Sequence, residues 1–429
     1  MEKTASDAYA FNRMPMNERV SLFNVTMVRM GMATSLAQFM LGTTLGHGMT
    51  FFQAMLATSL GSIILIFVSF GLGYAGMREG LSTSVLSRWC GFGKLGSMLI
   101  GLAIAISLLG WFGVNISLIS TSLLTVLGNN ISYFWCSIIG GVVFSFLVAF
   151  GFKALSITAK IAVPLFLSVI FFMCYTEIVK HTGDSLFFSS PSGNTISLGD
   201  GATMVAGLFI VGALITPDTS RYCKSGKHVF WMITSSVIIG EFFINGIAIL
   251  VARSLGTSNV VEIMINTAGW VGVVTVILSA IKVNDTNLYS ASINITGFLE
   301  MLTGRKFNYA AITLIIGAMG TLLSLSGLLD YFIPFLMALG LIFPPIAGVM
   351  LVDYYILRTS RQCLASSREK GILPDDASIP STSYIALISC AIGSTAGLFI
   401  SYGIPSLNSI LVAGITYWIF IKVKSTVIK

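Results

Sequence analysis

The chain has 429 residues, of which 55% are hydrophobic and only 10% are charged, whereas a soluble globular domain carries roughly 25% charged residues. With a mean hydropathy of +0.89, it has too few charges to cover a water-exposed surface, which excludes a soluble enzyme. The apolar segments are long and do not alternate with a period of two, as strands of a membrane barrel would. We therefore predict an all-α integral membrane protein built from helices of about 20 residues.

Short polar loops divide the chain into about twelve apolar segments of bilayer-spanning length. The first twenty residues are polar and mixed in charge, without a basic stretch, a short apolar core and a cleavage site, so no removable signal peptide is expected. The segments fall near 21–45, 50–75, 95–128, 132–151, 158–176, 201–217, 229–252, 265–283, 309–326, 329–357, 384–401 and 405–421.

The positions of the basic residues predict the orientation. With a cytoplasmic N-terminus, all but four of the 24 Lys and Arg residues fall on the cytoplasmic side. Of the four, Lys180 and Arg253 lie outside, and Arg29 and Lys282 lie within spans. Because cytoplasmic loops carry an excess of Lys and Arg, we expect a multi-pass protein of the cytoplasmic (inner) membrane with both termini inside. The net charge of +7 then reports topology and not nucleic-acid binding.

The loops are too short to hold a separate soluble core. We predict a cytoplasmic N-terminal tail (1–20), two five-helix repeats (21–176 and 201–357), a cytoplasmic linker (358–383), and two extra helices with a basic C-terminal tail (384–429). The six cysteines include no CxxC pair, so neither a disulfide framework nor a metal site is expected.

Glycine and proline interrupt two of the spans. The first span contains Ala33-Thr-Ser-Leu-Ala-Gln38 and then a glycine-rich stretch, 42–48, while the sixth contains Gly207, Gly212 and Thr216-Pro217. The two spans occupy corresponding places in the two halves. Paired interruptions of this kind indicate an inverted-repeat transporter with its binding site at the breaks. The alternative is that the glycines only allow helices to pack closely.

The stretch 279–289 is unusually polar for its apolar surroundings, with a cation (Lys282), an anion (Asp285) and two amides (Asn284 and Asn287). The apolar run before it, 266–281, spans only about 24 Å as a helix, short of a hydrocarbon core of about 30 Å. We therefore expect the helix to continue through these polar residues inside the bilayer. The alternative is that it ends near 283 and Lys282 extends to the headgroups.

Four motifs follow one another along the chain: Gly110-Trp-Phe-Gly-Val114, Thr216-Pro-Asp-Thr-Ser-Arg221, Asn284-Asp-Thr-Asn-Leu-Tyr289 with Asn294-Ile-Thr-Gly297, and Pro344-Pro-Ile-Ala-Gly-Val-Met-Leu-Val-Asp353. Together they resemble the nucleobase–cation symporter family (purine/cytosine permeases), in its cytosine-permease branch, over nearly the whole chain. The resemblance implies the leucine-transporter fold, with a 5+5 inverted repeat plus two C-terminal helices.

The resemblance also implies a substrate site. In that branch an aromatic ring from the third span and one from the sixth enclose the substrate, and an asparagine of the eighth span lies on its edge. The matching residues here are Trp111, Phe209 and Asn284. Offset stacking favours a flat heterocycle, and an amide offers both a donor and an acceptor. The alternatives are two ordinary packing aromatics and a structural hydrogen bond from Asn284.

Two positions depart from the cytosine permeases. A glutamine one turn before the third-span aromatic is replaced by Leu108, and a serine two residues after the sixth-span aromatic is replaced by Val211. Both changes remove hydrogen-bonding groups, and a site that loses such groups should not hold the same polar edge with the same selectivity. We therefore expect a different or less polar heterocycle than cytosine.

The cation site departs further. Sodium-dependent members carry an asparagine and two adjacent hydroxyls on the eighth span, where the matching residues are Ser279, Lys282 and Val283. These face the region of Gly31 and Ser35 in the broken first span. Two of the three oxygen ligands are absent, and the lysine ammonium would repel a sodium ion.

We hypothesise that the Lys282 ammonium replaces the sodium ion and that transport is coupled to protons, because burial disfavours the charged form of a lysine. The alternatives are a static ion pair with Asp285, three residues later on the helix, and extension of Lys282 to the headgroups. Glu241 and Arg29 also lie within spans, where an ionisable residue is a functional candidate; they pair with each other, or Glu241 is a second proton site. Asp353, at a span end, is expected to be solvated.

These inferences predict a secondary transporter that imports a nucleobase-like heterocycle by alternating access, with H⁺ as the coupling ion and no other cofactor. A sodium-coupled cytosine permease is the alternative. An intramembrane enzyme is not expected, because the sequence has no HExxH or GxSxG motif. A substrate-gated channel would need a repeated filter motif, which is not found. We expect a monomer whose partners are the substrate and the bilayer, and no nucleic acid.

Overall fold

The computed structural model describes residues 12–128, 130–150, 154–180, 185–375, 379, 381–400 and 402–427. The predicted tail (1–20) and the predicted C-terminal segment therefore lie partly outside the described residues. The described part is all-α, as predicted, and its only β-bridge is an isolated one between Val20 and Cys223.

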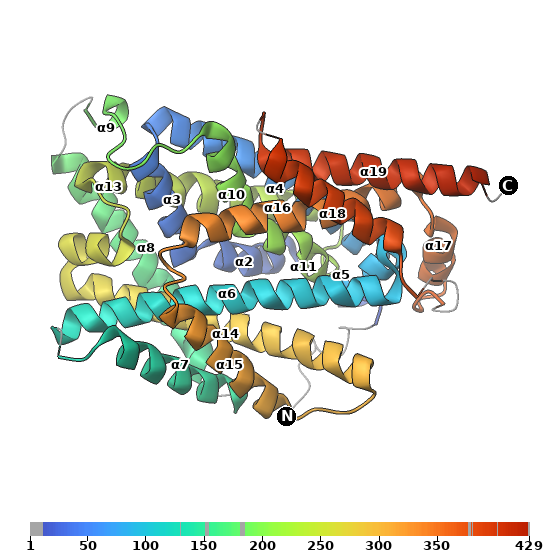
Figure 1. The fold of residues 1–429 in the computed structure, drawn as a ribbon, viewed down its shortest axis with the longest axis horizontal. Helices are drawn as coiled ribbons and strands as arrows, with labels where there is room; N and C mark the ends of the chain where they lie inside the picture. Colours follow the sequence, from blue (N-terminus) through green and yellow to red (C-terminus); the bar gives the residue numbers. More distant parts are fainter. Residues whose placement is uncertain are drawn as a thin grey trace.

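Helices make up nearly all of the described chain (Figure 1). The first half contains α2 (Leu22–Ala33), α3 (Leu36–Gly48), α4 (Phe51–Glu79), α5 (Thr83–Ser87), α6 (Gly93–Leu127), α7 (Tyr133–Ala149), α8 (Ala154–Lys180) and α9 (Ser185–Phe188). The second half contains α10 (Leu198–Leu214), α11 (Thr216–Ser220), α12 (Gly226–Val237), α13 (Asn245–Leu255), α14 (Val260–Thr303), α15 (Tyr309–Leu325) and α16 (Phe332–Leu351). The chain ends in α17 (Arg361–Glu369), α18 (Tyr384–Phe399) and α19 (Pro405–Val427).

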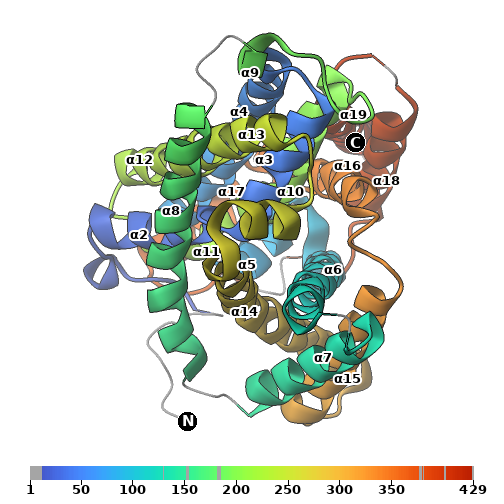
Figure 2. The same cartoon turned by 90° about the vertical axis from the view of Figure 1, so that its left-hand side faces the viewer.

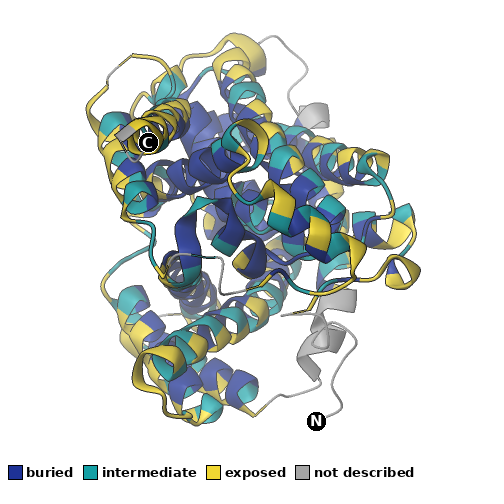
Figure 3. Cartoon of the chain, turned by 90° about the vertical axis from the view of Figure 1, so that its right-hand side faces the viewer, coloured by how far each residue is buried: buried dark blue, intermediate teal, exposed yellow. Residues whose placement is uncertain are grey.

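Six of the described helical segments are long and apolar enough to cross a membrane, and five shorter apolar helices accompany them. Many large apolar side chains are exposed on the outside, for example Phe67 at 62% and Trp270 at 75%. Figure 3 shows that the buried residues lie in the centre and the exposed residues on the outer surfaces. An apolar surface of this kind belongs in lipid, because a soluble monomer rarely exposes large contiguous apolar areas.

The helices form two groups. In one group α10 packs on α4, α13 packs on α3, and α12 packs on α2. In the other, α6 packs on α14 and α15 packs on α7 and α6. Figure 2 shows α7 and α15 together at one side of the molecule and α3, α4 and α13 at the other. The helix α8 contacts both α14 and α13, so it connects the two groups.

Both predicted helix interruptions are present, but each is narrower than the sequence suggested. The first span breaks at Thr34 and Ser35, between α2 and α3. The sixth breaks at Ile215, between α10 and α11. The glycines of 42–48 and Gly207 stay inside helices. A Cβ at Gly207 would lie 2.1 Å from the Leu336 carbonyl oxygen of α16, so this glycine allows close helix packing, as the alternative interpretation held.

The polar stretch 279–289 lies in the middle of α14, which continues to Thr303. The prediction that the helix runs through Asn284 and Asn287 is therefore confirmed, and an end near 283 is wrong. The helix bends sharply at Gly269, whose φ of 57° and ψ of −141° are accessible to glycine but not to a residue with a Cβ. The straight part of the helix begins only after Gly269, so the apolar segment that leads straight to Lys282 is shorter than the run 266–281.

The segment predicted as a linker, 358–383, contains the nine-residue helix α17. It follows a π-helical segment, η4 (Val352–Leu357), at the end of α16. Because α17 packs against α4, the segment is a structured part of the molecule and not only a tether.

Candidate functional site

Lys282 reaches from α14 to the break in the first span. Its Nζ donates a hydrogen bond to the carbonyl oxygen of Gly31 at 2.8 Å and lies 3.4 Å from the carbonyl oxygen of Thr34. These carbonyls end α2, where the last C=O groups of a helix lack partners in the helix and carry a partial negative charge. The ammonium group thus occupies a position that suits a cation.

One alternative for Lys282, the static ion pair with Asp285, is wrong. Among the described residues no ion pair joins Lys282 to the half-buried Asp285, although the two lie three residues apart on one helix. The amine is instead bonded to the backbone of α2. The helix end, and not the neighbouring carboxylate, is its partner.

The other residues of the predicted cation region surround this contact. Ser279 and Val283 line a narrow crevice together with Lys282, Thr34 and Ser35, and the Ser279 side chain is buried, with 5% exposed. The Ser35 hydroxyl accepts a hydrogen bond from the backbone N–H of Gln38, so it caps the first turn of α3. The predicted residues of this region thus lie together around the Lys282 amine, while the carbonyl of Thr34 was not among the predicted groups.

Asn284 is fully buried, with 0% exposed. Its Nδ2 donates a long hydrogen bond of 3.4 Å to the carbonyl oxygen of Phe112 in α6, while its Oδ1 has no hydrogen-bond partner among the described residues. A buried polar atom without a partner costs about 1–3 kcal/mol. The unpaired Oδ1 of Asn284 is therefore available to accept a hydrogen bond from a bound ligand.

The predicted aromatic residues belong to one apolar core but have different neighbours. Trp111 is buried and packs edge-on against Phe335, with ring centroids 5.2 Å apart, and against Phe332 at 6.2 Å. Phe209 instead lines a small cavity. The two rings do not contact each other in the described structure, so a substrate ring enclosed between them stays a prediction.

Leu108 and Val211 both pack in the same core as Trp111. Val211 is buried with 7% exposed, whereas Leu108 is partly buried. The positions that carry polar groups in the cytosine permeases are therefore apolar parts of the interior here.

Glu241 and Arg29 share a cavity with Phe209 but do not form an ion pair among the described residues. Of the two alternatives for these residues, the one in which they pair with each other is therefore wrong. The cavity has a volume of about 20 Å³, enough for one water molecule. Arg29 donates to the carbonyl oxygen of Gly212 at 2.8 Å and to the Ser69 hydroxyl at 3.3 Å. The buried Arg29 is thus paired with neutral groups and not with the Glu241 carboxylate.

The partner of Glu241 is Gln38, which the sequence reasoning did not single out. Its Nε2 donates to the Glu241 carboxylate at 2.9 Å, and its Oε1 has no partner among the described residues. Gln38 is fully buried just after the break in the first span. A lone amide within an apolar, interrupted span was the signal that could have found it.

Asp353 was expected to be solvated, and this is wrong. Its side chain is only 1% exposed. Both carboxylate oxygens accept from the Thr359 hydroxyl, at 2.5 and 2.8 Å. The partner of this carboxylate is the Thr359 hydroxyl, which follows the span end, and not bulk water.

Two interrupted helices, a cation held at the first break and buried polar groups around it define an inverted-repeat membrane transporter. The family model for permeases of cytosine/purines, uracil, thiamine and allantoin matches residues 14–419. The chain therefore belongs to this nucleobase–cation symporter family, and it is a permease and not an enzyme.

The relatives agree with this assignment. The chain is 27% identical to the cytosine permease of Escherichia coli strain K12 over 409 residues, which cover 94% of this chain and 92% of the relative. Its fold is similar to the inward-facing conformation of Mhp1, with a TM-score of 0.77, 17% identity, and coverage of 96% and 93%. It is also similar to Mhp1 in a closed conformation with bromovinylhydantoin bound, with a TM-score of 0.72, 17% identity, and coverage of 95% and 94%. These likenesses confirm the predicted fold class.

Proposed function

We propose that this permease imports a small, flat aromatic heterocycle by alternating access, coupled to protons, with the Lys282 ammonium in place of a sodium ion. The observation that carries the proposal is the hydrogen bond of 2.8 Å from Lys282 Nζ to the Gly31 carbonyl oxygen. A positive charge of the protein beside these carbonyls supports the proposal, because the resemblance to sodium-dependent members leads us to expect the ion in this region.

The residues present do not fit a sodium ion. A hard cation needs several oxygen ligands, and of the three matching side chains only Ser279 carries one. Val283 supplies a hydrocarbon surface, and Lys282 supplies a charge of the same sign. Two unit charges about 4 Å apart repel each other by about 4 kcal/mol at an effective dielectric constant of about 20. A sodium ion beside the ammonium would thus be strongly disfavoured.

The contact suggests how a proton is coupled to movement. While protonated, Lys282 joins α14 of one helix group to the end of α2 in the other. A neutral amine is a weaker donor and loses the attraction of the helix dipole. Release of the proton therefore weakens the contact between the groups and favours their separation. Protonation from the other side of the membrane restores it.

The proposed substrate is a nucleobase-like ring, such as a pyrimidine, a purine, hydroxymethylpyrimidine or a hydantoin-like ring. Asn284 Oδ1, buried and without a partner, would accept a hydrogen bond from a ring N–H, and Trp111 and Phe209 would stack on the ring faces. The apolar Leu108 and Val211 support a less polar edge than that of cytosine. The E. coli relative is named a cytosine permease, so cytosine belongs in any test.

We also propose that both ends of the chain face the cytoplasm, across the inner membrane. The excess of Lys and Arg in the loops on that side supports this orientation. A cysteine introduced at an exposed loop residue such as Lys306 would be labelled by an impermeant reagent only after the membrane is opened.

Substrate binding to the purified protein tests the proposal. A panel of labelled cytosine, uracil, purines, thiamine and allantoin is titrated in sodium buffer and in choline buffer at constant ionic strength. We expect at least one heterocycle to bind with the same affinity in both buffers. Binding that requires sodium would contradict the role given to Lys282, and the absence of binding by any heterocycle would contradict the substrate class.

A further inference from the structure

A pocket lies away from the transport site, at the end of the molecule where α4, η4 and α17 meet. Its volume is about 160 Å³, much larger than that of the cavity beside Phe209. Four arginines from three different elements line it: Arg78, Arg358, Arg361 and Arg368. The sequence places all four on the predicted cytoplasmic side.

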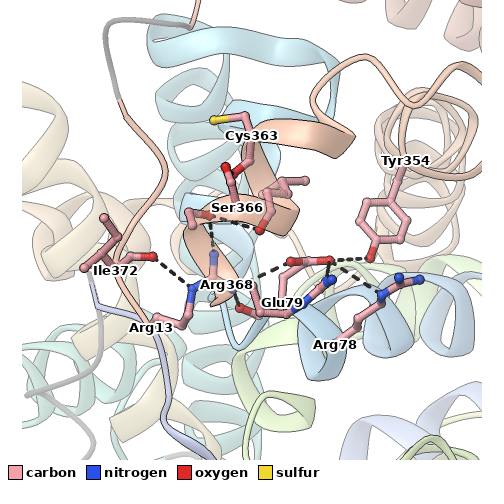
Figure 4. A network of polar contacts seen from close by, with 10 residues as sticks. Arg13, Arg78, Glu79, Tyr354, Cys363, Ser366, Arg368 and Ile372 are labelled. Carbon is pink, nitrogen blue, oxygen red and sulfur yellow. Dashed lines mark hydrogen bonds and ion pairs between the residues drawn. The ribbon is translucent and has the colours of Figure 1, made fainter. Parts of the chain in front are cut away.

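Two carboxylates also line this pocket, but both already have partners. Glu79 is 3% exposed, and its Oε1 accepts from Arg368 at 2.7 Å and from the Tyr354 hydroxyl at 2.9 Å. Its Oε2 lies 3.6 Å from Arg13 and has no hydrogen-bond partner among the described residues. Figure 4 shows these groups gathered around the Glu79 carboxylate. Asp353 is held by Thr359, as described above. The negative charges in the pocket are thus balanced within the protein.

Several hydrogen-bond donors that line the pocket have no acceptor among the described residues. Arg358 uses its Nε for the carbonyl oxygen of Tyr355 at 3.0 Å, which leaves its terminal nitrogens. Arg361 has no side-chain hydrogen bond or ion pair in the part of the chain that the structure describes. Trp89 is 3% exposed, yet its Nε1–H has no hydrogen-bond partner among the described residues. A buried donor without a partner is costly, so it points to a ligand.

The backbone at Arg358 gives a further indication. Its φ of 58° and ψ of 37° make it the one non-glycine residue with a positive φ among the described residues. Glycine usually occupies this position after a helix, because a Cβ is strained there. Strained backbone persists where a side chain has a task that the surroundings enforce. The residue with this backbone conformation, Arg358, lines the same pocket as the other three arginines.

We propose that this pocket binds a phosphate group. The planar guanidinium forks of arginine pair with the oxygens of phosphate through two parallel hydrogen bonds, and the Trp89 N–H and the Ser360 hydroxyl are suitable further donors. The phosphate belongs either to the headgroup of an anionic lipid, which is enriched at the cytoplasmic surface, or to a free phosphate in the cytoplasm. In both cases it bridges α17 to α4 and η4, and so holds α17 in place.

The test uses radiolabelled inorganic phosphate and the full-length protein in nanodiscs. One set of discs contains phosphatidylcholine alone, and a second set also contains phosphatidylglycerol. We compare the unchanged protein with Arg361→Gln and with Trp89→Phe, which keeps the ring and removes the donor. Arg305→Gln is the control, because Arg305 is an exposed arginine in the loop after α14 and lies outside the pocket.

We expect saturable phosphate binding in phosphatidylcholine discs, weakened about tenfold or more by Arg361→Gln, weakened less by Trp89→Phe and unchanged by Arg305→Gln. If a lipid headgroup is the natural occupant, phosphatidylglycerol displaces the phosphate; if a free phosphate is, binding is equal in both discs. The proposal is overturned if the unchanged protein binds no phosphate in phosphatidylcholine, or if Arg305→Gln weakens binding as much as Arg361→Gln.

Discussion

Exchanging Lys282 for methionine removes the ammonium group but keeps a side chain of similar length. The hydrogen bond to Gly31, at 2.8 Å, is charge-assisted, and such a bond contributes about 1.5–3 kcal/mol net. The second contact, at 3.4 Å to Thr34, is too long to add much. We therefore expect Lys282→Met to destabilise the conformation with the two helix groups joined by about 2 kcal/mol.

A change of about 2 kcal/mol corresponds to roughly thirtyfold in a conformational equilibrium. If the joined conformation is the one that binds substrate, apparent affinity falls by up to the same factor. The assay is heterocycle binding to purified protein in sodium and in choline buffer. Lys306→Met, at an exposed lysine in the loop after α14, is the matched control and should bind normally.

The double variant Lys282→Thr, Val283→Thr sharpens this prediction. It replaces the ammonium and a methyl group by two hydroxyl oxygens next to Ser279, and these can join the Gly31 and Thr34 carbonyls around a hard cation. We expect sodium to restore substrate affinity in the double variant but not in Lys282→Met. The reasoning is refuted if Lys282→Met binds substrate normally, or if sodium rescues both variants equally.

Three further substitutions test the rest of the site. Trp111→Ala should weaken heterocycle binding by about tenfold or more through lost stacking and burial, whereas Trp270→Ala, at a position that is 75% exposed, should not; equal effects would contradict the aromatic contact. Val211→Ser returns a hydroxyl to the interior and should raise the affinity for cytosine relative to thiamine about tenfold; an unchanged ratio would remove Val211 from the specificity site. Gly207→Ala should destabilise the protein by about 1–3 kcal/mol, measured as thermal unfolding in detergent, because its Cβ would collide with the backbone of α16. Gly297→Ala, with nothing within 4 Å of the added Cβ, should be tolerated, and similar losses in both would contradict the packing argument.

The sequence predicted the break near Thr34 from the interruption of the first span, and it predicted the helix through Asn284 from the length that a bilayer requires. A bilayer sets a minimum helix length, so an apolar run that is too short must continue into the polar residues that follow it. The orientation of Lys282 did not follow from that argument. It depends on the free carbonyls at the end of α2, and these are backbone groups that carry no sequence signature.

The sequence did not predict the buried charges at the other end of the molecule. Glu79 and Asp353 lie near span ends, where hydropathy indicates contact with water. Glu79 is buried where Arg368 of α17 and Arg13 of the N-terminal segment reach it, and Asp353 is buried with Thr359 as its partner. Contacts of this kind join residues nearly 300 positions apart, and a single sequence read in local windows does not contain them.

The central claim, that the Lys282 ammonium replaces sodium, is tested most directly by heterocycle uptake into proteoliposomes with proton and sodium gradients imposed separately. We expect an inward proton gradient to drive accumulation in sodium-free medium and an inward sodium gradient at equal pH not to do so. Accumulation that needs the sodium gradient and ignores the pH gradient would contradict it.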